Sequence, residues 1–381
     1  MKLRTRFVAR RLLSLAAGGS DFAVSCFRIG FKQPRPPFLH TLAAMRVYVC
    51  GLGVVGLAVC NLISTREASL QVRFGFAPVL AGAGDSRIVL TDTTLDPHSI
   101  IAAKMAHTLA SLPGATPAAE VAPETLAARL HAAGIKVFID CSPTNLKAAA
   151  TPTARMMAML SRGIHVISAN KGPLATAMAE LDAAAKAGGA KLRYSATVGG
   201  GTPMLATGHT LNMGETVTAI AGIVNGTTNF ILWKMADEGW TFAAALAEAQ
   251  RLGYAETDPT ADIDGWDAAA KVVILANSVL NIPAKVGDVT VVGISGVTSE
   301  HIAKAKAAGN VIKLIAHASA DRLSVTPTEV SAAGPLNTAG GTNAIEFTLA
   351  SGAAVTLTGR GAGGPETATS IMRDIVDIAI S

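Results

Sequence analysis

The chain has 381 residues, of which 50% are apolar and only 15% are charged, a composition typical of a globular protein with one or two folded domains. This composition excludes a disordered or fibrous protein. The sequence has no uncharged apolar run of about 18 residues, the length that would predict a membrane-spanning helix. The net charge of +5 comes from residues 1–44, which carry +7 and leave −2 for residues 45–381. We therefore expect neither nucleic acid nor a membrane as a partner.

Residues 1–44 are rich in arginine and hold a single acid, Asp21. Three interpretations stay open for this extension: translation upstream of a true start at Met45, an organelle transit peptide, or a structural or binding arm. The four cysteines, Cys26, Cys50, Cys60 and Cys141, form no CxxC pair or metal-binding cluster. This favours a reducing compartment, which we expect to be cytoplasmic unless the extension is a transit peptide.

A glycine-rich turn follows the first expected strand, residues 45–50, and precedes a helix expected over residues 57–63. The turn consists of Gly51, Leu52, Gly53, Val54, Val55 and Gly56. A GxGxxG pattern in this position is typical of dinucleotide binding, because its glycines permit a tight turn, close approach of a pyrophosphate and packing of the helix on the strand. We expect the turn to bind a dinucleotide; a glycine turn without a ligand is the alternative.

The acid expected about 20 residues after such a turn is missing. The best second strand is residues 87–92, preceded by a lengthened helix and by a loop rich in glycine and alanine. Asp92 at the end of this strand suits a ribose 2′-hydroxyl and would favour NAD over NADP, with a turn or helix cap as a close alternative. Both NAD and NADP therefore stay open as cofactors.

Two later strands are expected over residues 135–140 and 165–168, and each is followed by a polar side chain. Ser142 follows the first strand, and Lys171 follows the second. Because ligands lie beyond the carboxyl ends of parallel strands, we expect both side chains in the same crevice as the glycine turn. An ordinary turn is the alternative for residues 170–173.

The next two strands are expected over residues 191–198 and 217–224. The first ends in three consecutive glycines, whose bare backbone allows close contact with a small ion or ligand. The second leads into a polar turn, residues 225–229, and then a helix that we expect Thr227 or Thr228 to cap.

Five acids stand within residues 256–267 of an otherwise weakly charged chain. Asp267 and Lys271, four residues apart, share one face of a helix whose following turns are apolar. On an exposed helix such a pair contributes only about 0.3–0.5 kcal/mol. At the mouth of a buried helix it suits substrate binding and proton transfer, and a purely structural pair is the equal alternative.

From Met45 onward these motifs resemble the homoserine dehydrogenase family. The most specific stretch is residues 253–271, a Gly-Tyr-Ala-Glu-Thr-Asp-Pro run that ends in Asp267-Ala-Ala-Ala-Lys271. Four further stretches match the family in the same order: residues 168–171, 197–203, 225–229 and 359–368. The resemblance implies an NAD(P)-dependent, reversible reduction of L-aspartate 4-semialdehyde to L-homoserine, in threonine and methionine biosynthesis, by a monofunctional short form of the enzyme.

The resemblance also implies roles for individual residues. Lys271 is the proton donor or acceptor at the substrate oxygen, and Lys171 lies near the nicotinamide and the substrate. Glu256 and Asp267 hold the amino end of homoserine, and Asp262 supports them. The cofactor contacts that the turn, the strand ends and the resemblance together indicate are Gly51, Gly53, Val54, Val55, Gly56, Asp92, Ser142, Lys171 and Gly363.

A monovalent cation, sodium, is implied at four backbone carbonyls: those of Ser195, Val198, Gly200 and Thr202. Ser195 departs from the family, in which glutamate is common at this position. If the contact is a backbone carbonyl, the change is harmless. If a carboxylate helps, cation binding here is weaker.

The expected fold class is α/β. We expect a Rossmann dinucleotide-binding domain over residues 45–173 and a mixed α/β catalytic and dimerisation domain over residues 174–348. Residues 349–381, with a helix from Ser370, are expected to return to the dinucleotide domain. The resemblance implies a homodimer, and apolar strands such as residues 217–224 suit a sheet continued across a two-fold axis.

Two rival functions stay open. One is another Rossmann oxidoreductase that acts on a different semialdehyde or amino acid; an acylating enzyme would need a catalytic cysteine, and only Cys141 is placed for it. The other is a nucleotide-sensing or scaffold protein without catalysis. The presence of Lys171, Glu256, Asp267 and Lys271 argues against that second rival.

Overall fold

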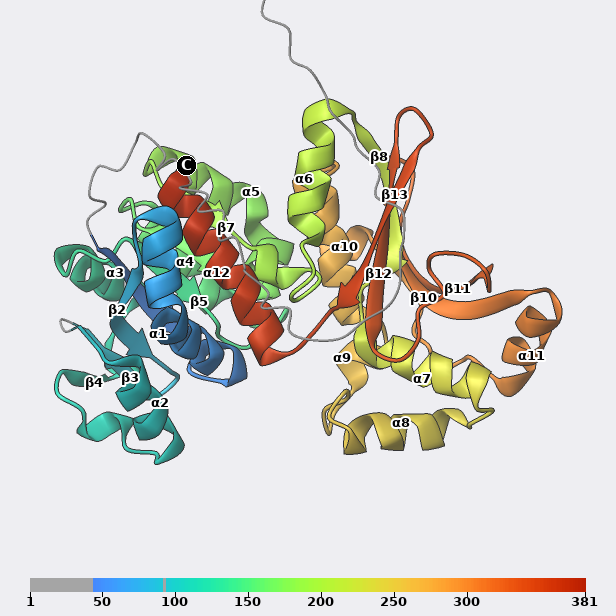
Figure 1. Cartoon of the computed structure of the whole chain (residues 1–381), viewed down its shortest axis with the longest axis horizontal. Coiled ribbons are helices and arrows are strands. Elements are labelled where there is room, and N and C mark those ends of the chain that lie inside the picture. The colour runs from blue at the N-terminus through green and yellow to red at the C-terminus, as the bar shows by residue number, and fades with distance from the viewer. Residues whose placement is uncertain (1–43, 92–93) are drawn as a thin grey trace, which may run out of the picture. The chain divides into compact units, whose positions relative to one another are not determined.

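The computed structural model describes residues 44–91 and 94–381, which contain two β-sheets and their covering helices (Figure 1). The first sheet has seven strands in the order β4-β3-β2-β1-β5-β6-β7. Its strands are β1 (Met45–Cys50), β2 (Pro78–Gly84), β3 (Ile88–Leu90), β4 (Ala115–Pro117), β5 (Val137–Asp140), β6 (His165–Ser168) and β7 (Leu192–Arg193). All neighbours pair in parallel except β3, which runs antiparallel to β2 and β4.

The helices around this sheet come mostly between its strands, as in other doubly wound folds. They are α1 (Val54–Phe74), α2 (Pro97–Met105), α3 (Pro123–Ala132), α4 (Ala150–Leu160) and α5 (Lys171–Ala187), with the 3-10 turns η1 (Leu109–Ser111) and η2 (Ala118–Glu120). Strands β1 and β5 are buried over most or all of their length, because helices cover both faces of the sheet. This confirms the predicted Rossmann fold and brings the carboxyl ends of β1, β5 and β6 to one edge.

The second parallel strand is β2, and not residues 87–92 as the sequence analysis predicted. β2 pairs with β1 over its whole length, with Gly84 opposite Cys50, whereas β3 turns back against β2. The glycines that suggested a loop make room for a buried tyrosine: a Cβ on Gly84 would lie 2.4 Å from the Tyr48 hydroxyl. Asp92 lies outside the described residues.

The second sheet has six strands in the order β13-β12-β8-β10-β11-β9. Its strands are β8 (Val217–Ile223), β9 (Thr290–Val291), β10 (Asn310–Ser319), β11 (Leu323–Ser331), β12 (Thr342–Leu349) and β13 (Ala354–Arg360). The helices of this part are α6 (Met204–Gly214), α7 (Gly226–Asp237), α8 (Phe242–Arg251), α9 (Thr260–Ile263), α10 (Trp266–Ser278) and α11 (Ser299–Ala307), with the 3-10 turn η4 (Val286–Asp288). Pairing is antiparallel except between β11 and β9. Helices and strands together form this part, which confirms the predicted mixed α/β class.

The first sheet continues beyond Pro173, where we had placed the domain boundary, because β7 pairs with β6. The strand expected over residues 191–198 ends at Arg193. Ser195–Thr197 instead forms the 3-10 turn η3, in which the Thr197 amide donates to the Tyr194 carbonyl.

The last helix, α12 (Gly364–Ile380), begins six residues before the predicted start at Ser370 and packs along α1 (Figure 1). Gly364 permits this contact, since a Cβ there would lie 2.6 Å from Cγ1 of Val54. The C-terminal helix therefore packs on the helix that follows the glycine turn. Across the described ranges, no helix is both long and apolar enough to cross a membrane.

Candidate active site

Three charged side chains meet where the first sheet faces α10. Asp267 lies between two lysines: its Oδ2 is 2.7 Å from Nζ of Lys271, and its Oδ1 is 3.4 Å from Nζ of Lys171. Lys271 also donates to the Val224 carbonyl at 2.5 Å and is only 7% exposed. The structure thus brings together Lys171, Asp267 and Lys271, although Lys171 comes from a helix of the first sheet.

Local sequence explains how α10 presents this pair. Gly265, with a φ of +87°, ends the preceding turn in the left-handed region, and α10 starts at the next residue. Residues 268–276 are all buried, so the helix enters the core directly after its first residues. Asp267 and Lys271 therefore lie at the mouth of a buried helix, as predicted.

Asn225, between β8 and α7, contacts both acids of the site. Its Nδ2 donates to Oδ1 of Asp262 at 2.6 Å and to Oδ2 of Asp267 at 3.0 Å. Its Oδ1 accepts from the Thr228 amide at 2.9 Å, so Asn225 caps α7. The expectation that Thr227 or Thr228 is the cap was wrong, because the Thr227 hydroxyl donates to the Tyr254 carbonyl and the Thr228 hydroxyl points back to Asn225. The sequence pattern alone did not indicate Asn225 as a site residue.

The surroundings shift the pKa values of the two acids in opposite directions. Burial disfavours ionisation of Asp267, but Lys271 and Lys171 outweigh it and hold the pKa of this carboxyl well below its usual value. Burial, and then the negative charge of Asp267, raise the pKa of Asp262. Asp267 is therefore ionised over the whole useful pH range, whereas Asp262 takes up a proton more readily.

Glu256 is not part of this cluster. Its side chain is exposed and makes no hydrogen bond or ion pair with any described residue. Only its backbone is engaged, through a 3.2 Å bond from Nε2 of Gln250 to its carbonyl. The structure therefore leaves the Glu256 carboxylate free.

The glycine turn has the backbone shape that a pyrophosphate requires. Gly51 has a φ of +93°, and a Cβ there would lie 2.5 Å from the Cys141 carbonyl carbon. A Cβ on Gly56 would lie 1.9 Å from the Gly51 oxygen, so the close approach of helix to strand needs glycine. Gly53 faces open space, and no side chain caps α1. The free amides at this helix start, beside Val54 and Val55, fit a phosphate anion.

Ser142 and Lys171 lie at neighbouring strand ends, as predicted. Ser142 Oγ donates to Oδ1 of Asp140 at 2.5 Å and accepts from Nδ2 of Asn170 at 3.1 Å. The Lys171 amide donates to Oγ1 of Thr144 at 3.1 Å. These bonds link the ends of β5 and β6 and set the start of α5, where Lys171 is the first residue.

Asp85 occupies the position at which a dinucleotide-binding sheet usually holds the adenosine ribose, directly after β2. Its carboxylate accepts from Nζ of Lys104 at 2.5 Å and from the amides of Arg87 and Ile88. Burial opposes ionisation of Asp85, but the Lys104 and backbone hydrogen bonds lower its pKa. A cavity of about 120 Å³ here is lined by Asp85, Arg87, Ile88, Lys104, His107, Leu109 and Ala110. Asp85 was not predicted from the sequence, because the glycines of β2 indicated a loop.

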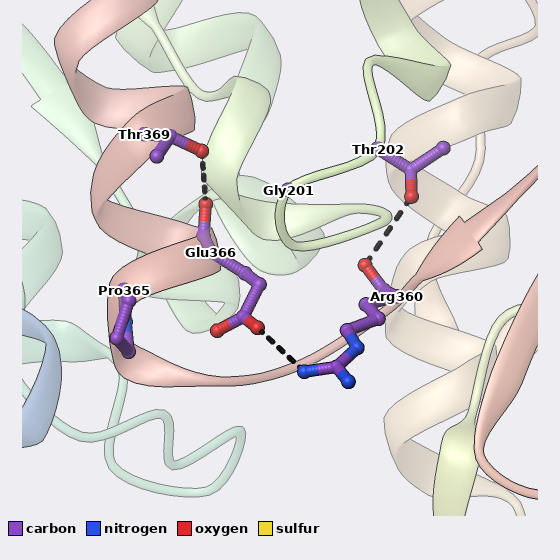
Figure 2. Close-up of a pocket in the computed structure, with 6 residues that line it drawn as sticks. All are labelled: Gly201, Thr202, Arg360, Pro365, Glu366 and Thr369. Atoms are coloured by element: carbon purple, nitrogen blue, oxygen red, sulfur yellow. Dashed lines mark hydrogen bonds and ion pairs between the residues drawn. The ribbon is translucent and has the colours of Figure 1, made fainter.

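A second cavity, of about 420 Å³, lies beside the late glycine loop before α12 and is lined by Gly201, Thr202, Arg360, Pro365, Glu366 and Thr369 (Figure 2). Nη1 of Arg360 is 3.2 Å from Oε1 of Glu366, and Oγ1 of Thr202 donates to the Arg360 carbonyl (Figure 2). Gly363 caps α12 with a φ of +125° and no side-chain bond. The cavity contains none of the lysine–carboxylate cluster.

The four predicted cation ligands belong to the loop that leads into this cavity. The Gly200 carbonyl accepts from Oγ of Ser370, and the Thr202 carbonyl accepts from the Met204 amide at 2.8 Å. A carbonyl oxygen has two lone pairs, so each can still bind an ion, and hard oxygen donors fit sodium. Oδ2 of Asp374 accepts from the Ser195 amide at 3.0 Å, so a carboxylate lies next to the Ser195 backbone. Burial raises the pKa of Asp374 to about 6.

A Rossmann sheet with a pyrophosphate cradle, next to a lysine–carboxylate–lysine cluster, defines a nicotinamide-dependent oxidoreductase. The family model "Homoserine dehydrogenase, NAD binding domain" matches residues 51–195, and the model "Homoserine dehydrogenase" matches residues 203–376. The chain belongs to the homoserine dehydrogenase family. That family reduces L-aspartate 4-semialdehyde to L-homoserine, reversibly, with NAD(P), in threonine and methionine biosynthesis.

Individual relatives agree with this assignment. The NAD(+)-dependent homoserine dehydrogenase of Pseudomonas canavaninivorans is 35% identical over 87% of this chain and 96% of that protein. The homoserine dehydrogenase of Methanocaldococcus jannaschii is 42% identical over 64% of this chain and 72% of that protein. Among solved structures, a putative homoserine dehydrogenase from Archaeoglobus fulgidus is 31% identical and has a TM-score of 0.79 over 88% of this chain and 100% of that one. A hyperthermophilic archaeal homoserine dehydrogenase in complex with NADPH is 26% identical, with a TM-score of 0.76 over 89% and 98%.

Proposed function

We propose that Lys271 donates the proton to the substrate oxygen when the semialdehyde is reduced, and takes it back in the reverse reaction. This role is supported by the number of N–H groups of the Lys271 ammonium that already have an acceptor. Of three N–H groups, one is held by Asp267 and one by the Val224 carbonyl. The third has no acceptor among the described residues and is available for a substrate oxygen.

The neighbouring charges suit the reaction. A bound nicotinamide supplies the hydride to the carbonyl carbon. As negative charge develops on oxygen, the Lys271 ammonium stabilises it and transfers its proton. Lys171, on the other oxygen of Asp267, adds a second positive charge at the same place. Asp267 holds both lysine side chains at the site.

Replacing Lys271 by alanine tests this role. We expect kcat for aspartate semialdehyde reduction to fall by about 10³-fold, within the range for loss of a general acid, while dinucleotide binding persists. Lys304→Ala, on the exposed face of α11, is the matched control and should keep full activity. Near-wild-type turnover of Lys271→Ala at every pH would show that another group supplies the proton.

For the amino end of the substrate we propose Glu256, Asp262 and Asp267. The Glu256 carboxylate has no protein partner among the described residues, so binding an ammonium there breaks no existing ion pair. Glu256→Gln should raise KM for homoserine about tenfold with a smaller effect on kcat, as measured by steady-state kinetics.

For the cofactor, we propose that Asp85, Arg87 and Lys104 bind the ribose of the dinucleotide, the role expected of Asp92. Ser142, Gly363 and the glycine turn are the other proposed contacts. The pocket holds an acid suited to a ribose hydroxyl and two cations suited to a 2′-phosphate, which supports binding of both NAD and NADP. Arg87→Ala should weaken NADP binding about tenfold and leave NAD binding within about twofold, by calorimetric titration.

For the cation, we propose sodium at the carbonyls of Ser195, Val198, Gly200 and Thr202, with Asp374 nearby. Sodium chloride should raise the melting temperature more than choline chloride at equal ionic strength. Equal melting curves in the two salts would argue against the site.

For assembly, we propose a homodimer that uses the second sheet. β8, which we expected to suit this contact, lies inside the sheet, and β13 is an edge strand whose outer side has no partner strand among the described residues. Light scattering should give twice the chain mass of 38.8 kDa.

The described cysteines, Cys50, Cys60 and Cys141, are free thiols, which supports a reducing compartment such as the cytoplasm.

A further inference from the structure

Asn225 is oriented by the backbone of α7. Its Oδ1 accepts from the Thr228 amide at 2.9 Å, and an amide nitrogen could not accept that bond. The side chain is therefore fixed with its Nδ2 toward the acids, and Asn225 is only 5% exposed. Both hydrogens of this NH₂ group are used, one on Asp262 and one on Asp267.

We propose that Asn225 is a positioning residue of the reaction: its amide holds the carboxylates of Asp262 and Asp267 side by side and keeps Asp267 on Lys271. This inference rests on the proposed role of Lys271.

Two carboxylates that share a buried site repel each other, and a donor that bonds to both offsets that repulsion. Asn225 supplies one N–H to each without adding charge, and a lysine in its place would add a third cation. The residue before it, Val224, accepts from Lys271 through its carbonyl. The end of β8 therefore fixes both members of the Asp267–Lys271 pair, the acid through a side chain and the lysine through the backbone.

Two substitutions separate this role from helix capping. Asn225→Asp and Asn225→Ser both retain an oxygen that can cap α7. The serine variant loses the second donor, and we expect kcat to fall about tenfold. The aspartate variant puts a third carboxylate against two others, and we expect kcat to fall about 100-fold at pH 8. That loss should shrink as the pH is lowered, because a protonated carboxyl can donate again.

Thr241→Asp, the same kind of change at the cap of α8, is the control and should keep kcat within about twofold. Melting curves and NADPH binding of each variant report folding, and the serine variant decides the question if the aspartate variant does not fold. Capping alone predicts that aspartate is tolerated at position 225. Wild-type kcat in either folded variant would therefore overturn the proposal. An equal loss of kcat in both variants, with the pH profile of the wild type, would overturn it as well.

Lys271→Ala is measured in parallel so that two failures can be told apart. If Lys271→Ala is inactive while Asn225→Ser is unaffected, only the positioning role fails. If Lys271→Ala stays active, the proposed proton donor fails, whatever the Asn225 variants do.

Discussion

Lys271 and Lys313 are both buried lysines of the same half of the molecule, with 7% and 2% of their surface exposed, and yet their surroundings differ. Lys271 is paired with a carboxylate, Asp267, which itself contacts a second lysine. Lys313 donates to Oδ1 of Asn229 at 3.0 Å and to the Thr338 carbonyl at 2.6 Å, and within the described ranges it has no ion pair. Burial lowers the pKa of Lys313 to about 8.

The difference shows that burial of a lysine does not by itself indicate catalysis. Asn229 links Lys313 to a turn, because its Nδ2 donates to the carbonyls of Gly340 and Thr342 at 2.9 Å each. Gly341 in that turn packs on the Tyr254 ring, where a Cβ would lie 2.5 Å from Cε1. Lys313 therefore holds a turn to α7, whereas Lys271 lies in a cluster of charges, paired with Asp267 next to a second lysine.

The largest expected effect is on turnover. Lys271→Met should lower kcat by about 10³-fold, whereas Lys313→Met should keep kcat within about fivefold, because only the first removes a proton donor. Steady-state kinetics with aspartate semialdehyde measures both. Equal losses in the two variants would break the distinction between a catalytic and a structural lysine.

The next effect is on stability, at the partner of Lys313. Asn229→Ala removes the donor of the Gly340 carbonyl, one of the two donors of the Thr342 carbonyl, and one acceptor of Lys313. We expect a loss of about 3 kcal/mol in the free energy of unfolding, from urea titration, because several buried polar groups lose partners. A loss below about 1 kcal/mol would mean that the turn is held by other contacts.

A smaller effect is expected from pH. The folded-state pKa of Lys313, about 8, lies below the usual value of 10.5, so between these two values the unfolded chain binds more protons at this residue. Stability from this group therefore rises with pH above 8. Relative to Lys313→Met, the wild type should gain on the order of 1–2 kcal/mol between pH 7 and pH 9.5. A constant difference across that range would show that Lys313 titrates normally.

The smallest effect should be the stability change of Lys271→Met. Asp267 keeps Lys171 and Asn225 as partners after this change, so it is not left as an unpaired buried charge. We expect a loss of about 1 kcal/mol or less in urea unfolding. A loss of several kcal/mol would give Lys271 the structural importance that we assign to Lys313.

Much of the fold followed from local patterns. The strand–glycine–helix unit at Gly51, the strand ends before Ser142 and Lys171, and the helix that carries Asp267 and Lys271 all have the predicted form. These features depend on residues close together in the chain, where spacing alone decides which side chains share a face. The prediction of the second parallel strand was wrong, because the glycines of β2 make room for Tyr48, a residue of another strand.

The sequence by itself determined the motifs, their order and the pairing of Asp267 with Lys271, since one helical turn sets that distance. Only the tertiary structure decided that Lys171 reaches the other oxygen of Asp267, that Asp85 rather than a later acid ends the second parallel strand, and that Asn225 joins two acids. Each of these depends on how separate elements pack, because the contact is set by strand order and helix placement and not by spacing along the chain. The same packing brings the Val224 carbonyl to Lys271, which leaves the donor that we propose for the substrate oxygen.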